Sequence, residues 1–240
     1  MKNVLKQSRF FIEYIILHIF FIFLSFLPIN FVSTFGGFIL KICGPFSKSH
    51  NVAISNFKKI FSDIDKNEIK KKVGESWKNL GKTIFEISIL EKLVDKKNNK
   101  IKINGLENIN SLINSNEKVI FFSIHQSNWE ILVPVIDKLG ISVGAIYRHI
   151  NNKFIDRLVL KKRNQSINSK RSFYTPKGKE SAKEILSAIN NNLSIILLID
   201  QKDTAGDEIK LFNIVAKTQT GFLKIARKYN LKLVPVQNIR

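Results

Sequence analysis

Residues 119–130 read Val119-Ile120-Phe121-Phe122-Ser123-Ile124-His125-Gln126-Ser127-Asn128-Trp129-Glu130, and this stretch indicates the fold class. Its first six residues are a short, apolar and partly β-branched run, which is typical of a strand buried on both faces of a sheet. After Glu130, apolar residues recur at helical spacing as far as Gly140, which predicts a helix that ends at this glycine. The stretch is therefore predicted to pass from a buried strand through a turn into a helix.

Strand and helix patterns alternate along the rest of the chain. Apolar runs predict strands at residues 141–147, 193–199 and 231–234, and helical spacing predicts helices near residues 66–90, 180–190 and 222–229. This alternation implies an α/β fold with a mostly parallel central sheet flanked by helices, whose ligands gather at the carboxyl ends of the strands. Because His125, Arg148 and Asp200 each follow a predicted strand, we expect them at one edge of the sheet.

His125 and Glu130 form a candidate catalytic pair. A neutral imidazole can take a proton from a hydroxyl near neutral pH, and a carboxylate bonded to its second nitrogen fixes the tautomer. A continuous helix would hold the two side chains apart, whereas a strand-to-helix turn can bring them together. The pattern lacks a nucleophile of its own, so it favours transfer to a substrate alcohol over hydrolysis. The alternative is a capping box, in which Ser127 caps the helix and Glu130 bonds back to the cap.

The composition narrows the class of protein. A length of 240 residues is enough for one α/β core with an appended segment. A formal net charge of +20 implies a polyanionic partner, which is nucleic acid, an anionic membrane, a phosphorylated substrate or an acidic carrier protein. Cys43 is the single cysteine and the four histidines are scattered, so neither an internal disulfide nor a zinc site is expected.

Two apolar stretches predict a membrane anchor at residues 1–45, before a catalytic domain at residues 46–240. Residues 10–27 are almost uniformly apolar and barely long enough to cross about 30 Å of hydrocarbon, and residues 29–42 are apolar as well. A cleaved secretory signal is the competing interpretation, but no small-x-small cleavage site follows Leu27. Positive charge lies on both sides of the first stretch, so the pattern leaves open whether the anchor spans the membrane or lies in one leaflet.

Residues 148–179 carry ten lysines and arginines against one acid, Asp156. Apolar residues alternate with cations in the first part of this segment, which predicts an amphipathic helix on a membrane surface. Arg148, Arg163 and Arg171 are the preferred phosphate ligands, because a guanidinium can bind phosphate through two hydrogen bonds. The alternatives are a solvated charged face and a nucleic-acid site. No nucleic-acid-binding motif accompanies the charge, and the apolar anchor favours a membrane partner.

Several short motifs, taken together and in order, resemble one enzyme family. They are Asn104-Gly105-Leu106-Glu107-Asn108, residues 119–130, Tyr147-Arg148, Asn151-Asn152, Arg163, Asp200-Gln201 and Ala216-Lys217-Thr218. Along essentially its whole length the chain is similar to the lipid A biosynthesis lauroyl/myristoyl acyltransferases of the lysophospholipid acyltransferase-like superfamily. The histidine and acid of residues 125–130 alone also match glycerolipid acyltransferases. Trp129-Glu130, Tyr147-Arg148 and Asp200-Gln201 point to the lipid A branch.

The resemblance implies a membrane-bound acyltransferase of the bacterial inner membrane, with its catalytic domain on the cytoplasmic face. It would move a fatty acyl chain from an acyl carrier protein thioester to a hydroxyl of a lipid A precursor. Its partners would be acyl carrier protein, an anionic glycolipid and the membrane, and it would need no metal or organic cofactor. His125 would be the general base with Glu130 as its partner. The candidate substrate-binding residues are Arg148, Arg163, Asp200, Gln201, Asn128 and Arg171.

Members of that family usually continue well past the position of Arg240, so we expect this chain to lack the last strands and helices of the domain. Two other functions stay open on the sequence. One is a glycerolipid or other glycolipid acyltransferase with the same histidine and glutamate chemistry, which the mass of the product distinguishes. The other is a non-catalytic protein that binds anionic membranes through residues 148–179, which liposome binding without acyl transfer would favour.

Overall fold

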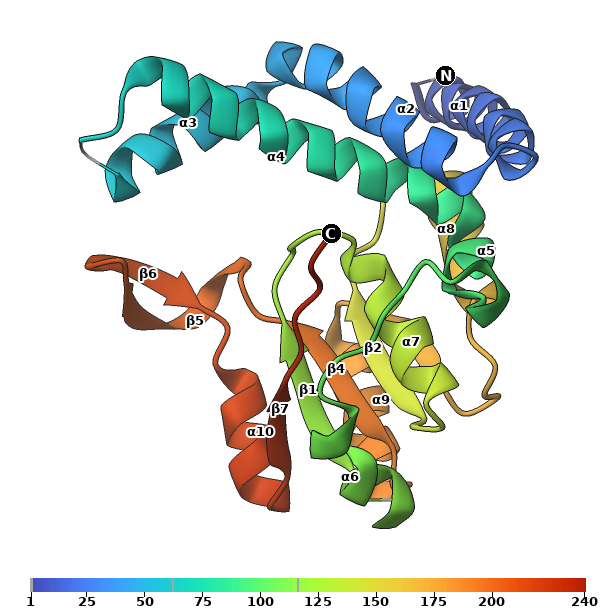
Figure 1. Ribbon diagram of the computed structural model, residues 1–240, viewed down its shortest axis with the longest axis vertical. Coiled ribbons are helices and arrows are strands. Elements are labelled where there is room, and N and C mark those ends of the chain that lie inside the picture. The colour runs from blue at the N-terminus through green and yellow to red at the C-terminus, as the bar shows by residue number, and fades with distance from the viewer. Residues whose placement is uncertain (1, 62, 116) are drawn as a thin grey trace.

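The computed structural model describes residues 2–61, 63–115 and 117–240 (Figure 1). A five-stranded sheet lies at its centre, in the order β3-β2-β4-β1-β7, and every neighbouring pair is parallel. The strands are β1 (Val119–Ser123), β2 (Val143–Tyr147), β3 (Phe173–Pro176), β4 (Ser194–Leu198) and β7 (Lys232–Pro235). The expected α/β fold with a mostly parallel sheet is therefore confirmed.

Helices cover both faces of the sheet. They are α7 (Leu132–Lys138) on one face and α9 (Lys179–Asn190) with α10 (Gly221–Tyr229) on the other. Neighbouring residues of β1 point to opposite faces, so Phe121 packs in the cluster with Ile136 of α7, while Ile120 packs with Ile189 and Phe222. Phe121 and Ile120 are both almost completely buried, as the continuous apolar run predicted.

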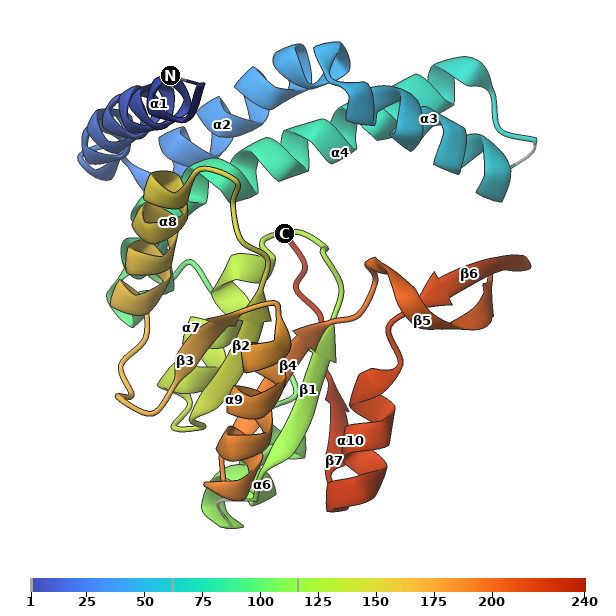
Figure 2. The same cartoon turned by 180° about the vertical axis from the view of Figure 1, so that it is seen from behind.

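Four further helices form a layer across the carboxyl end of the sheet (Figures 1 and 2). They are α1 (Lys2–Ser25), α2 (Ile29–Cys43), α3 (Lys48–Ile60) and α4 (Lys66–Glu86). Within this layer, α2 and α4 approach each other closely at Gly36 and Gly81. A Cβ added to Gly81 would lie 2.2 Å from the carbonyl oxygen of Gly36, so only glycine fits at this crossing.

The basic segment contains α8 (Lys153–Gln165), which packs beneath α1. Leu158 and Val159 of α8 are buried in one cluster with Phe21 of α1, and Ile155 packs against the same cluster. The predicted helix is therefore present, but its apolar side contacts the protein. The expectation that this side lies on a membrane was wrong, because the sequence pattern cannot distinguish a lipid surface from the apolar side of another helix.

The segments Val4–Ser25 and Ile29–Phe46 are long and apolar enough to cross a membrane, by length and composition. Only 17% and 28% of their apolar windows are buried within the protein. The large exposed apolar side chains are Val4, Leu5, Phe11, Ile12, Ile15, Ile16, Ile19, Ile22 and Phe23 on α1 and Phe31, Phe38 and Ile42 on α2. So many exposed apolar side chains on two helices are typical of contact with a membrane or a partner. The domain boundary at residue 45 stays a prediction.

The remaining elements are short, apart from one hairpin. They are α5 (Leu90–Val94), α6 (Asn110–Ser115), and the 3-10 turns η1 (Gly44–Phe46), η2 (Ile87–Ile89), η3 (Lys96–Asn98), η4 (Leu106–Asn108) and η5 (Trp129–Ile131). The strands β5 (Lys202–Leu211) and β6 (Ile214–Thr218) pair as an antiparallel hairpin that projects from the domain (Figure 2). Phe212 and Asn213 at its tip both have positive φ, as a two-residue hairpin turn requires. The sequence patterns did not predict this hairpin.

Candidate active site

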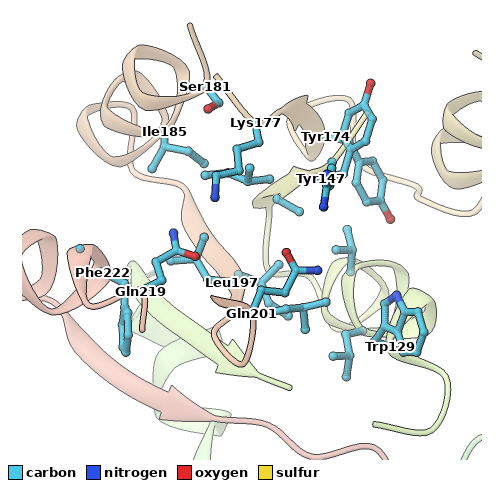
Figure 3. A pocket seen from close by; sticks show the side chains of 18 of the residues that line it. Trp129, Tyr147, Tyr174, Lys177, Ser181, Ile185, Leu197, Gln201, Gln219 and Phe222 are labelled. Carbon is cyan, nitrogen blue, oxygen red and sulfur yellow. The ribbon is translucent and has the colours of Figure 1, made fainter. Parts of the chain in front are cut away.

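A cavity of about 660 Å³ opens at the carboxyl end of the sheet, around β2 and β4. Trp129 and Tyr147 lie on one side of it, Ile185 and Phe222 lie on the opposite side, and Gln201 lies between them (Figure 3). The volume is in the range of small-molecule sites, and most of the lining is apolar. His125 and Arg148, which follow β1 and β2, line this cavity together with Gln201. Asp200, which follows β4, is not part of the lining and contacts His125.

His125 is bonded to Asp200 through both its ring and its backbone. Its Nδ1 lies 2.6 Å from Oδ1 of Asp200, and its backbone N–H donates to Oδ2 at 2.9 Å. β1 and β4 are neighbouring parallel strands, so the residues that follow their carboxyl ends lie side by side. The carboxylate therefore fixes the position of the imidazole and its rotation.

The charge of Asp200 determines the tautomer of His125. Burial alone would raise the pKa of the Asp200 carboxyl, but the hydrogen bonds from the ring and backbone of His125 outweigh burial and hold this pKa below its ordinary value. An ionised carboxylate can only accept hydrogen bonds, so Nδ1 carries the proton and Nε2 carries the lone pair. Nε2 lies 3.2 Å from Nε2 of Gln201, whose amide can donate to it.

Glu130, the expected partner of His125, pairs with Arg163 instead. Its carboxylate oxygens accept from Nε and Nη2 of Arg163 at 2.7 and 2.6 Å. Burial alone would lower the pKa of this guanidinium, but the bonds to Glu130 raise it, so Arg163 stays charged. No hydrogen bond joins Glu130 to His125 in the described part of the chain. The expected contact is absent because η5 directs Glu130 toward α8, and a catalytic role for Glu130 stays a prediction.

Arg163 is poorly placed for the phosphate binding expected of it. Its side chain is 14% exposed, and its Nε and Nη2 are already bonded to Glu130. Its guanidinium lies 5.3 Å from the centre of the Tyr147 ring. Arg171 lies away from the cavity, where it donates to the carbonyl of Asn191. Arg148 lines the cavity, is exposed, and forms no hydrogen bond or ion pair with any residue that the structure describes.

Asn128 caps η5 and does not reach the cavity. Its Oδ1 accepts from the backbone N–H of Glu130 at 3.0 Å, and its Nδ2 donates to Glu86 at 2.6 Å. The side chain is buried with both ends of the amide in use, and the contact of Asn128 with substrate stays a prediction. The capping box at Ser127 is wrong, because Asn128 is the cap and the Glu130 carboxylate bonds Arg163.

The family model of the bacterial lipid A biosynthesis acyltransferases matches residues 1–240 of this chain. The chain belongs to this family. The resemblance seen in the sequence motifs is thereby confirmed, and membership identifies the protein as an acyltransferase of lipid A biosynthesis with a lipid A precursor as the implied substrate. A comparison with curated proteins finds no match.

Two features of this lipid A acyltransferase site were missed by sequence reasoning. Asp200 was assigned to substrate binding, although its place at the end of the strand next to β1 could have suggested contact with His125. Glu86 was not singled out, although it is a carboxylate in an apolar part of α4 and is 3% exposed. A charged residue among apolar neighbours is the signal that could have found it.

Proposed function

We propose that this lipid A acyltransferase moves a fatty acyl chain from the thioester of acyl carrier protein to a hydroxyl of a lipid A precursor. His125 acts as the general base, and Asp200 orients it. The observation that carries this assignment is the geometry of His125, whose Nδ1 is bonded to an ionised carboxylate while the side chain lines the cavity. The lone pair on Nε2 faces the amide of Gln201 at 3.2 Å, and a substrate hydroxyl that displaces this amide can donate to it.

The reaction needs only the two substrates and the side chains of the site. The acceptor oxygen attacks the thioester carbonyl carbon while Nε2 of His125 takes the hydroxyl proton, and the imidazolium is stabilised by Asp200. Collapse of the tetrahedral intermediate breaks the carbon–sulfur bond, and the proton passes to the sulfur of the carrier. The amide of Gln201, next to Nε2, can donate to the developing oxyanion. No metal or organic cofactor takes part in these steps.

The shape and charge of the cavity support these substrates. The wall formed by α9, α10 and β4 presents apolar side chains that suit an acyl chain, among them Ile185, Leu197 and Phe222. Arg148 at the cavity is the best-placed cation for a phosphate of the acceptor. The net charge of +20 favours encounters with an acidic carrier protein and an anionic membrane.

A mixed-substrate assay tests the function. Membranes that carry the protein are incubated with acyl carrier protein thioesters, a tetra-acylated lipid A precursor and glycerolipid acceptors, and the products are weighed by mass spectrometry. We expect the lipid A precursor to gain the mass of one acyl chain. Acylation of the glycerolipid alone would assign the second enzyme function. Binding to anionic liposomes without transfer from any donor would assign the non-catalytic function.

We further propose that α1 and α2 lie in one leaflet, with the catalytic domain on the cytoplasmic face. Four polar contacts tie α2 and the turn before it to the rest of the protein. They are Lys41 Nζ to Glu75 at 3.1 Å, Lys92 Nζ to the carbonyl of Leu27 at 3.2 Å, Lys100 Nζ to Oδ1 of Asn30 at 3.1 Å and Arg240 Nη1 to Ser33 Oγ at 3.2 Å. The adjacent helix α4 carries lysines along its length, which are costly in hydrocarbon. A spanning α2 would have to leave α4 and break these contacts.

The position of Asn30 relative to the membrane tests this arrangement. Cys43→Ser removes the single cysteine, and Asn30→Cys then introduces a thiol near the start of α2. On inside-out vesicles, we expect a membrane-impermeant maleimide to label this variant and the unmodified protein to similar extents, because both positions face the cytoplasm. A spanning α2 would carry Asn30 to the opposite side, and Asn30→Cys would then be labelled only after detergent is added.

A further inference from the structure

The turn between β1 and η5 carries His125 and Trp129 into the cavity, and the two rings meet edge to face with centroids 5.0 Å apart. Ser127, in the middle of this turn, has φ of 50°, in the left-handed region that favours glycine and asparagine. A serine there is unfavourable unless surrounding contacts hold it. The contacts that hold the turn come from outside the sheet.

The underside of α4 binds the backbone of this turn directly. Thr83 Oγ1 and Asn79 Nδ2 lie 2.8 and 3.2 Å from the carbonyl oxygen of Ser127, and both can donate to it. Thr83 is completely buried. Asn79, Thr83 and Glu86 are spaced by three or four residues, so they project from one side of the helix toward the turn.

Glu86 at the end of α4 joins three separate parts of the chain. Its Oε2 accepts from Nδ2 of Asn128 at 2.6 Å and from Nη2 of Arg240 at 2.9 Å, and its Oε1 accepts from Nη1 of Arg240. The side chain is 3% exposed, so the carboxylate is held by charged and polar partners away from water. Oδ1 of Asn128 in turn accepts a hydrogen bond from the backbone N–H of Glu130.

The segment that follows β7 completes the support of the turn. Asn238 Nδ2 donates to the carbonyl of Asn128, and Gln237 Nε2 donates to Oε1 of Gln126 at 3.3 Å. Arg240, besides binding Glu86, donates to Ser33 of α2. The buried carboxylate of Glu86 is therefore linked through Asn128 to the turn at the cavity and through Arg240 to the apolar helix α2.

We propose that Glu86 is a positioning residue that sets the placement of His125 and Trp129 through Asn128. Because Glu86 belongs to α4, the position of the layer formed by α1 to α4 then affects the geometry of the site. Only the expected change in kcat rests on the proposed acyl transfer. Glu86 does not line the cavity, so it acts through the turn and touches no substrate. An error of about 1 Å in the position of a reacting group can cost on the order of 100-fold in rate.

The test combines kinetics with a signal from the turn itself. Trp77 and Trp129 are the two tryptophans, so Trp77→Phe leaves Trp129 as the single reporter. In that background, we expect Glu86→Gln to lower kcat about 10- to 100-fold, with KM for the acyl donor changed less than about twofold. We also expect stronger quenching of Trp129 fluorescence by acrylamide, because a loosened turn exposes the indole.

Glu68→Gln is the matched control. Glu68 lies on the same helix, is solvent-exposed and forms no ion pair with any residue that the structure describes, so its loss should leave kcat and quenching unchanged. Unchanged kcat and unchanged quenching in Glu86→Gln would overturn the proposal, even if its melting temperature falls. Should Glu86→Gln not fold, Asn128→Ala cuts the link while keeping the pair of Glu86 with Arg240, and the same changes are expected. If the unmodified protein transfers no acyl chain, the proposed function fails, and the quenching result alone decides the role of Glu86.

Discussion

Replacement of His125 by alanine is expected to lower the rate of acyl transfer by about 10²- to 10⁴-fold, because the acceptor hydroxyl loses its general base. The side chain lines the cavity and is partly exposed, so its removal should change thermal unfolding little. The measurement is kcat with purified protein, acyl carrier protein thioester and lipid A precursor, together with the melting temperature. A His125→Ala protein that retains the full rate would remove His125 from the mechanism.

His149 offers a matched control for this replacement. It is also a histidine whose Nδ1 is bonded to a carboxylate, with Oδ2 of Asp156 at 2.7 Å, but it is 62% exposed and does not line the cavity. We therefore expect His149→Ala to keep an ordinary rate. An equal loss in the two variants would mean that the effect of His125→Ala comes from a general loss of folding.

The second large effect is expected from Asp200→Asn, which should lower kcat about 10⁴-fold, as the corresponding change does in serine proteases. An asparagine amide can donate to Nδ1 of His125, which places the proton on Nε2 and leaves no lone pair for the hydroxyl. The pKa of Asp200 is lower in the folded protein than in the unfolded chain, so its bonds to His125 stabilise the fold at pH values above the unfolded pKa. This stabilisation is lost as the pH falls through the folded pKa. Near pH 7 the Asp200 carboxylate is fully ionised, so kcat of Asp200→Asn and of the unmodified protein is compared at this pH.

Glu130→Gln is the decisive comparison for Asp200→Asn. It leaves the charge of Arg163 buried with a neutral partner, so we expect destabilisation of about 3–5 kcal/mol with a smaller loss of rate. Chemical denaturation and kcat are measured for both variants at pH 7. The opposite pattern, a 10⁴-fold loss at unchanged stability in Glu130→Gln and a normal rate in Asp200→Asn, would make Glu130 the partner of His125.

Most of the fold was predictable because its strands are buried on both faces. The apolar runs at 141–147 and 193–199 match β2 (Val143–Tyr147) and β4 (Ser194–Leu198), and helical spacing at 180–190 matches α9. The hairpin of β5 and β6 escaped prediction because its strands are largely exposed, so no apolar run or strict alternation marks them. The amphipathic pattern of α8 predicted a helix but not which surface its apolar side covers.

The sequence by itself determined the family, the order of the elements and the presence of His125 at the end of a buried strand. Each motif and each element behind these conclusions consists of residues that are close together in the chain. Only the tertiary structure decided which carboxylate meets the imidazole. Glu130 is five residues away in sequence, yet η5 directs it to Arg163, while Asp200 is 75 residues away and is brought next to His125 by the pairing of β1 with β4. Side-chain direction and strand order, rather than distance along the chain, determine such contacts.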